Sequence, residues 1–331
     1  MCDRQFLFVE IDSEMCAGKR GAATGINALK SVARTKKQTT FKDIGSIEVT
    51  SYNECLDDQT DTPSAKYIST YGKVFSNIAN DVSNSIKNSQ FPIVLSADHA
   101  NAAAVISGIK IADPNKKVGV IWIDAHADLH TPYTSPTGNI HGMPLSLAMG
   151  IDNIDKQRNQ VSEYVAETWD SLQNYQTGKP KLSTDALFFF GLRDTEMEED
   201  YLREKYNIPN ITVEELRQMG VQKSVQKAKK HLEDCDLIYV SFDVDSMDSE
   251  TVSDGTGTPV PNGFSLDESK KLVTTLLEQL EDQVCGFEIT EINPLLDSNK
   301  NSMAEAAYEV LMSALGTLES KNKQLDLSYT D

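Results

Sequence analysis

The sequence has 331 residues, of which 39% are hydrophobic and 24% are charged, and it contains neither a Gly/Ser/Pro-rich linker nor an internal repeat. Such a chain can bury a large core, which excludes solenoid architectures and long disordered regions. Its net charge of −19 argues against nucleic acid or an anionic membrane as the main partner and is compatible with a small cationic substrate.

The cysteines and the hydrophobic runs of the sequence indicate which cellular compartment to expect. The five cysteines are far apart and form no C-x-x-C pair, so we expect neither a zinc cluster nor a disulfide framework. The first ten residues lack the features of a signal peptide, and no apolar run is long enough to span a membrane. We therefore expect a cytoplasmic protein with one domain at residues 1–319 and a polar C-terminal tail at 320–331.

Short β-rich runs alternate with amphipathic stretches along the whole chain. Strands are predicted, in chain order, at Phe6–Ile11, Ile47–Tyr52, Pro92–Ala97, Val118–Asp124, Ala186–Leu192, Leu237–Asp245 and Val284–Ile292. Helices are predicted at Ala65–Lys87, Val161–Gln173, Ser224–Glu233, Asp267–Glu281 and Ser302–Leu318. This alternation predicts a mostly parallel sheet covered by helices on both faces, with a site beyond the carboxyl ends of the strands.

Metal-binding residue types follow three of these predicted strands. If the chain stayed extended there, spacings of two and four residues would turn the side chains to one side. Carboxylates placed together raise one another's pKa and repel unless cations lie among them. Two imidazoles and four carboxylates suit Mn²⁺ better than structural zinc, and six ligands suit two ions that share carboxylates. The predicted ligands are His99, Asp124, His126, Asp128, Asp243 and Asp245.

These blocks resemble the arginases of the ureohydrolase family, and most closely the bacterial ones. The resemblance rests first on Asp124-Ala-His-Ala-Asp128 and on Thr134-Ser-Pro-Thr-Gly-Asn-Ile-His-Gly-Met-Pro-Leu145. It extends from about residue 6 to residue 319, because further blocks occur in the same order at Ala17–Gly21, Gly191–Asp194, Ser241–Asp245, Gly255–Pro259 and Glu291–Pro294.

The resemblance implies a three-layer α/β/α sandwich and an enzyme with two Mn²⁺ ions that hydrolyses L-arginine to L-ornithine and urea. It also implies a homo-oligomer, either a trimer or a hexamer. The family pattern assigns one ion to His99, Asp124, Asp128 and Asp243, and the other to His126, Asp124, Asp243 and Asp245.

The same resemblance implies three catalytic roles. Glu291 is expected to orient the guanidinium group, and Asp128 to hydrogen-bond the attacking water as well as a metal. His141 is expected to protonate the departing amine, a task that suits a side chain titrating near neutrality.

The amino-acid end of the expected pocket departs from the family. His130 replaces the usual Asn, Thr137 the usual Ser, and Glu196 a shorter Asp. The expected contacts to the substrate's α-carboxylate and α-amino groups are His130, Ser135, Thr137, Asn139, Glu196 and Glu199.

Two further departures lie outside the predicted pocket. Ser96-Ala97 replaces a pair of glycines, which we expect to shift the loop that carries His99 and to weaken that metal position. Residues 152–183 are predicted to form a helical insertion near the surface.

Other functions stay open at this point. An agmatinase or guanidinobutyrase would use the same metals but would lack the residues that bind an α-carboxylate. Formimidoylglutamase is a further relative with the same fold. A two-metal phosphoesterase would need a basic cluster beside the metals, which these blocks lack. A degenerate member that only binds a ligand is a further alternative, although it would not need the complete set of predicted ligands.

Overall fold

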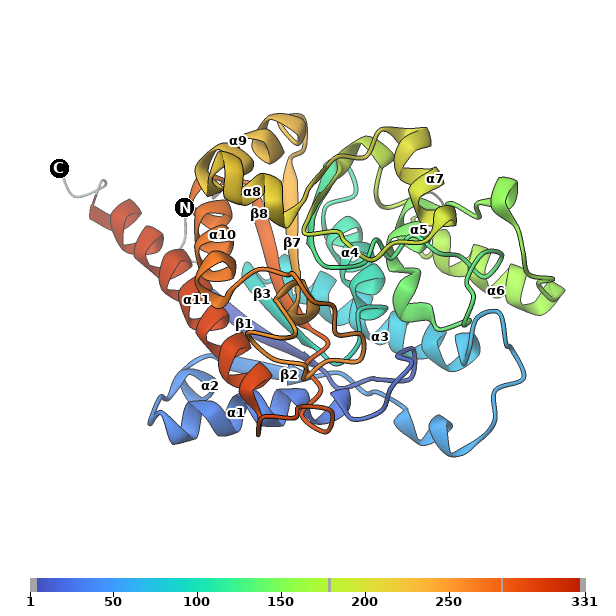
Figure 1. Ribbon diagram of the computed structural model, residues 1–331, viewed down its shortest axis with the longest axis horizontal. Helices are drawn as coiled ribbons and strands as arrows, with labels where there is room; N and C mark the ends of the chain where they lie inside the picture. The colour runs from blue at the N-terminus through green and yellow to red at the C-terminus, as the bar shows by residue number, and fades with distance from the viewer. Residues whose placement is uncertain (1–4, 178–179, 281, 328–331) are drawn as a thin grey trace.

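A parallel sheet of eight strands lies at the centre of the computed structural model, which describes residues 5–177, 180–280 and 282–327 (Figure 1). The strand order is β2-β1-β3-β8-β7-β4-β5-β6, and the paired strands are parallel throughout. The strands are β1 (Gln5–Ile11), β2 (Gly45–Glu48), β3 (Gln90–Ser96), β4 (Val118–Ile123), β5 (Leu187–Phe190), β6 (Asn210–Ile211), β7 (Leu237–Asp243) and β8 (Val284–Thr290).

Helices cover both faces of this sheet, which confirms the predicted three-layer α/β/α architecture (Figure 1). One layer contains α1 (Gly25–Thr35), α9 (Val221–His231), α10 (Leu266–Gln279) and α11 (Ser302–Leu327), packed one against the next. The other contains α3 (Ile68–Lys87), α4 (Asn101–Ala112), α5 (Pro144–Met149) and α6 (Glu163–Gln173). Shorter helices are α2 (Thr40–Asp43), α7 (Met197–Tyr206) and α8 (Val213–Met219).

The central strands are apolar because both of their faces are covered. All six residues of β4 are buried, and the large side chains of Trp122, Phe242 and Phe287 are fully enclosed. These strands therefore hold the chain segments that follow them in fixed positions. Among the described residues, no helix combines the length and the apolar character that crossing a bilayer requires.

Six of the seven predicted strands end earlier than expected, β3 and β4 by one residue and β8 by two. β2 ends at Glu48, and Tyr52 has a left-handed backbone with φ of 56° that an extended strand excludes. β5 ends before Gly191, whose φ is 94°. β7 ends at Asp243, and a 3₁₀ turn at Val244–Ser246 follows it. The prediction also missed β6, an edge strand of two residues.

The C-terminal helix is longer than predicted. α11 continues through Leu327, so the boundary predicted after residue 319 falls within it. Residues 328–331 of the predicted tail lie outside the described residues.

The region at 152–183 contains α6, and this helix packs against α3 and α5. Trp169 on α6 is 1% exposed, and its indole nitrogen donates a hydrogen bond to Asp152 Oδ1 at 3.0 Å. Lys181 follows the helix and donates to the carbonyl oxygen of Leu172 at 3.2 Å. The region is thus a helix anchored to the body of the protein by a buried aromatic side chain.

Replacing Trp169 tests this anchoring. Trp169→Ala leaves a cavity beneath α6 and should lower the free energy of unfolding by about 3–5 kcal/mol. Trp169→Phe keeps most of the packing and loses the hydrogen bond to Asp152, so a loss of about 1–2 kcal/mol is expected. The measurement is urea denaturation of both variants, and equal stability of Trp169→Ala and the wild type would contradict the packing of α6 described above.

Candidate active site

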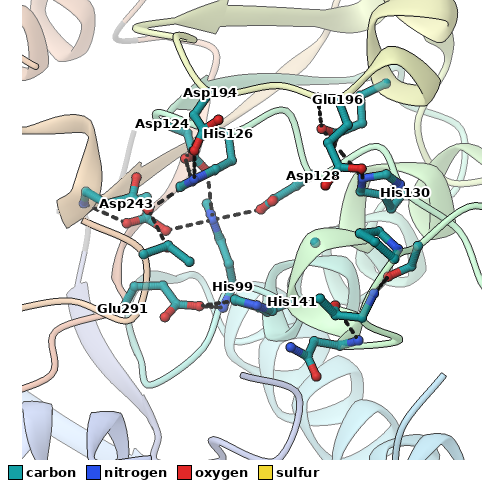
Figure 2. Close-up of a pocket in the computed structure, with 18 residues that line it drawn as sticks. His99, Asp124, His126, Asp128, His130, His141, Asp194, Glu196, Asp243 and Glu291 are labelled. Atoms are coloured by element: carbon teal, nitrogen blue, oxygen red, sulfur yellow. Dashed lines mark hydrogen bonds and ion pairs between the residues drawn. The ribbon is translucent and has the colours of Figure 1, made fainter. Parts of the chain in front are cut away.

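Four neighbouring strands deliver the predicted site residues to one edge of the sheet. β3, β8, β7 and β4 lie side by side, and their carboxyl ends lead to His99, Glu291, Asp243 and Asp124, respectively. A cavity of about 160 Å³ opens above them, and all fourteen predicted site residues line it. The sheet topology therefore brings together residues that are far apart in sequence (Figure 2).

Three of the strands end in the same kind of turn. Asp98, Asp124 and Asp243 each accept, through Oδ1, a hydrogen bond from the backbone N–H two residues later, at 3.0, 2.7 and 2.8 Å. Asp128 then takes a left-handed backbone with φ of 50°. The prediction that an extended chain aligns these side chains was wrong, because turns stabilised by the aspartates themselves produce the alignment.

One group of ligand atoms gathers around His99. Its Nδ1 lies 3.1 Å from Asp124 Oδ2, 3.2 Å from Asp128 Oδ2 and 3.1 Å from Asp243 Oδ2. One imidazole proton cannot serve three carboxylates, and both His99 Nδ1 and Asp124 Oδ2 are buried without a hydrogen bond of good geometry. The donor set and its unpaired atoms fit a divalent cation.

A second group shares Asp124 with the first. His126 Nδ1 lies 3.0 Å from Asp245 Oδ2 and 3.5 Å from Asp124 Oδ1. Asp124, His126 and Asp245 offer ligand atoms close enough to hold an ion, as do His99, Asp124 and Asp128. Two groups that share one carboxylate match the geometry expected for a pair of cations.

Proton affinities in this cluster reflect the crowding of its charges. Burial, and then the charges of Asp245 and Asp124, raise the pKa of Asp243 well above its usual range. Burial and the neighbouring Asp124 raise the pKa of Asp128 to about 6. Burial disfavours the charged form of His99, but three carboxylates raise its pKa overall. Without cations the cluster retains protons, which a bound metal has to displace.

The imidazole of His99 is held in place by contacts away from the aspartates. Its Nε2 lies 2.8 Å from Ser241 Oγ, which donates to the buried Glu288 at 2.7 Å. The ring stacks on Trp122 with 3.8 Å between centroids. These contacts present Nδ1 to the cluster, which is the orienting role that outer residues perform in metal sites.

The second group has its own supports. Asp194 Oδ2 lies 3.7 Å from His126 Nε2, and Thr258 donates a hydrogen bond to Asp245 Oδ2 at 2.9 Å. Arg193 donates to the backbone carbonyls of Asp245 at 2.7 Å and Met247 at 3.2 Å, which fixes the turn after β7. Asp194, Ser241 and Thr258 lie in blocks that resemble the family, but no role was predicted for them. Membership of those blocks was the available signal, and Ser241 also lies two residues before Asp243.

Ser96 is hydrogen-bonded within the loop after β3. Its Oγ donates to the carbonyl of Asp98 at 2.8 Å, and Asn101 donates to Ser96 Oγ at 3.0 Å. His99 lies with the other predicted ligands, and its Nδ1 is 3.1 Å from Asp124 Oδ2. A shift of this loop relative to the family and a weaker metal position there stay predictions.

Glu291 and His141 form a pair at the floor of the cavity (Figure 2). Glu291 is 2% exposed and has a left-handed backbone with φ of 68°. Its Oε1 accepts from the backbone N–H of His99 at 3.0 Å and from His141 Nδ1 at 3.1 Å. Burial lowers the proton affinity of His141, but Glu291 outweighs this and raises the pKa of the imidazole.

His130 lies at the other end of the cavity and is 7% exposed. Its Nδ1 is 3.2 Å from Thr134 Oγ1, while Nε2 faces Glu196 at 3.6 Å and Glu199 at 3.8 Å. Burial lowers the pKa of His130 to about 4, so the side chain is neutral at pH 7. It can donate a hydrogen bond to a ligand, but it does not offer a positive charge.

The remaining predicted substrate contacts lie in two walls beside His130. The hydroxyl wall is the loop 131–139, in which Ser135 Oγ accepts from Gly138 N at 2.9 Å and Thr137 Oγ1 accepts from Asn139 N at 3.2 Å. Gly138 has φ of 72°, and a Cβ there would lie 1.8 Å from a backbone oxygen of Pro63, so this turn requires glycine.

The acidic wall consists of Glu196 and Glu199 at the start of α7. Glu199 is 4% exposed and accepts from the backbone N–H groups of Leu129 at 3.1 Å and Glu196 at 3.0 Å. Burial raises its pKa to about 8. The hydrogen bonds of Glu199 therefore stabilise the acidic wall. The side chain of Glu196, in contrast, is 47% exposed and accessible to a ligand.

Comparisons with known proteins give one consistent result. Residues 5–316 match the arginase family. The arginase of Brevibacillus brevis is 30% identical over 319 residues, which cover 95% of this chain and 98% of that protein. The crystal structure of arginase from Bacillus subtilis superposes with a TM-score of 0.77 at 26% identity, covering 95% and 99% of the two chains. Entamoeba histolytica arginase in complex with L-ornithine shares the fold, with a TM-score of 0.78 at 22% identity over 96% and 100% of the chains.

Metal binding should stabilise the protein in a pH-dependent way. Mn²⁺ at a hundred times its Kd adds about 2.7 kcal/mol to the free energy of unfolding, which thermal unfolding of metal-free protein with and without Mn²⁺ detects. The stabilisation should weaken as pH falls through about 6, because Asp128, Asp243 and His99 take up protons in place of the metal. Asp243→Asn should abolish most of it, whereas the exposed Asp282→Asn should not. An Mn²⁺ effect that persists in Asp243→Asn would remove this residue from the metal site.

Proposed function

The chain belongs to the arginase family of hydrolases, and on that premise we propose that it cleaves the guanidinium group of L-arginine to give L-ornithine and urea, using two Mn²⁺ ions. The observation that carries the proposal is the cluster around His99 Nδ1, where three carboxylate oxygens approach within 3.2 Å. Relatives that are named arginases support arginine as the substrate.

We assign the metal ligands as the family pattern implies. One ion would be held by His99, Asp124, Asp128 and Asp243, and the other by His126, Asp124, Asp243 and Asp245. Two divalent cations held there would supply a water molecule of lowered pKa, which can act as the nucleophile at neutral pH. The distances from His99 and His126 to these carboxylates support the assignment.

Glu291 is proposed to hold the guanidinium group. Its Oε1 is occupied by the His99 N–H and His141, while Oε2 points toward the space beside Gly257 and is left for the substrate. A carboxylate pairs with a planar guanidinium through charge-assisted hydrogen bonds, which would place the guanidinium carbon near the metal cluster. Asp128 lies across the cavity, where its carboxylate could hydrogen-bond the attacking water.

His141 is proposed to move the proton that the departing amine needs. Its Nδ1 is held by Glu291 at 3.1 Å, which fixes the ring and favours the protonated imidazole. A group with this raised pKa can donate a proton near pH 7, when the C–N bond breaks.

The amino-acid end of the cavity supports an amino-acid substrate. His130, Ser135, Thr137 and Asn139 provide neutral hydrogen-bond donors suited to an α-carboxylate, and Glu196 provides an anion suited to an α-ammonium group. The proposal assigns Glu199 to the support of Glu196. Agmatine, 4-guanidinobutyrate and N-formimidoylglutamate remain the alternative substrates, because the same metal cluster could serve each of them.

Urea or formamide release distinguishes these substrates. Purified protein preincubated with Mn²⁺ should release urea from L-arginine with higher kcat/KM than from agmatine or 4-guanidinobutyrate, and it should release no formamide from N-formimidoylglutamate. A preference for agmatine or 4-guanidinobutyrate would reassign the enzyme within the family. Absence of product from all four compounds would refute hydrolysis of this substrate class.

Replacing Glu291 by Gln tests its role in orientation. The variant keeps the shape and loses the charge, so kcat/KM for arginine should fall about 10- to 100-fold, as for loss of a hydrogen bond between charged groups. Bound Mn²⁺ should stay at the wild-type amount, because Glu291 is not assigned as a ligand. Loss of metal together with activity would show that Glu291 acts on the metal site instead.

A further inference from the structure

Residues 152–159 have no role in the site described so far, although they connect its two walls. This bridging segment precedes α6, which anchors it through the hydrogen bond from Trp169 to Asp152. Its backbone and side chains contact the hydroxyl wall on one side and the start of α7 on the other. It therefore determines how these two parts of the cavity are spaced.

Four of the contacts to the hydroxyl wall are hydrogen bonds donated by main-chain and side-chain groups of the segment to backbone carbonyls of the wall. The backbone N–H groups of Arg158 and Asn159 donate to the carbonyl of Tyr133 at 2.9 and 3.0 Å. The Asn159 side chain donates to the carbonyls of Pro132 at 3.0 Å and Ser135 at 2.7 Å. These four hydrogen bonds hold the loop whose hydroxyl groups face the ligand.

The contacts to the acidic wall involve charge. Arg158 Nη1 donates to Glu198 Oε1 at 3.2 Å and lies 3.7 Å from Glu196 Oε2. Glu196 is thus placed between the neutral His130 on its inner side and the guanidinium of Arg158 on its outer side. Figure 2 shows Glu196 and His130 together, on the side of Asp128 that faces away from Asp243.

The charge of Arg158 matters because the amino-acid end of the cavity, around His130 and Glu196, has no permanently charged cationic side chain in its described lining. Among the described residues that line it, none is a lysine or an arginine. At the amino-acid end of the cavity, two cations of the described chain contact lining residues from outside: Lys66, which donates to Asn139 Oδ1 at 3.0 Å, and Arg158, which lies 3.7 Å from Glu196 Oε2. Of these two, Arg158 is the one paired with the acidic wall.

We propose that Arg158 is a specificity-determining residue that biases this end of the cavity toward ligands carrying an α-carboxylate and against ligands with an ammonium group alone. The inference rests on the proposed function, since it concerns the part of the substrate remote from the guanidinium group. Arg158 offsets the charge of Glu196, which reduces both its repulsion of a carboxylate and its attraction for an amine. Arg158 acts through Glu196 and is itself a positioning residue.

Ligand binding tests the proposal without turnover. L-ornithine and putrescine differ only by the α-carboxylate, so their Kd values for the Mn²⁺-loaded protein, measured by calorimetry, report selectivity at this end. Arg158→Ala should bind putrescine about threefold more tightly and ornithine no more tightly than the wild type, as expected for an exposed ion pair. Arg158→Lys keeps the charge and should preserve the wild-type ratio of the two Kd values.

Three controls separate the charge effect from a structural one. Lys230→Ala, on α9, removes an equal charge from an exposed ion pair with Glu233. It should leave the ratio of the two Kd values unchanged. Asn159→Ala loosens the hydroxyl wall without changing the charge, so it should weaken ornithine, whose carboxylate that wall is proposed to bind, without tightening putrescine. In a Glu196→Gln background, Arg158→Ala should shift the ratio less than in the wild type, because the charge through which it acts is gone.

The outcomes distinguish this inference from the proposed function. A parallel change for both ligands in Arg158→Ala, or no change in their ratio, overturns the specificity role even if the wild type hydrolyses arginine. A shifted ratio together with no urea release supports the role of Arg158 and refutes the proposed reaction. Failure of the wild type to bind either ligand overturns the specificity role, whereas urea release from arginine decides the proposed reaction separately.

Discussion

The structure depends on a concentration of negative charge at a place that water barely reaches. Asp124, Asp128 and Asp243 converge on His99 at the ends of parallel strands whose apolar residues are buried on both faces. Such charges are unstable together unless protons or cations lie among them, and the raised pKa values of Asp128 and Asp243 express that conflict. The rigid sheet holds the ligands in place against their mutual repulsion.

Much of this arrangement could be predicted from the sequence. The alternation of apolar runs and amphipathic stretches indicates a parallel sheet, and a parallel sheet assigns all strand ends to one edge. Residue type then singles out His99, His126 and the four aspartates. The turns could not be predicted in the same way, because extended and turned backbones give the same sequence spacing. The hydrogen bond that the backbone N–H of His126 donates to Asp124 Oδ1 is visible only in three dimensions.

The supporting residues were harder to foresee for a related reason. Glu288 reaches His99 through Ser241, and Arg193 fixes the turn of Asp245 through backbone carbonyls. These contacts join segments that are distant along the chain, and neither a serine in a strand nor an arginine in a loop is unusual by itself. The early end of β2 is a comparable case, because an edge strand has only one neighbour to continue its ladder.

The two ends of the cavity are built from different kinds of structure. The predicted metal ligands follow central strands of the sheet. The hydroxyl wall is a loop and the acidic wall is the start of α7, and a short segment outside the sheet connects these two walls. Sequence changes in that segment do not involve the residues that form the hydrophobic core. Substrate preference can therefore diverge during evolution, or be redirected by engineering, through exchange of a few surface residues while the hydrolytic centre is inherited intact.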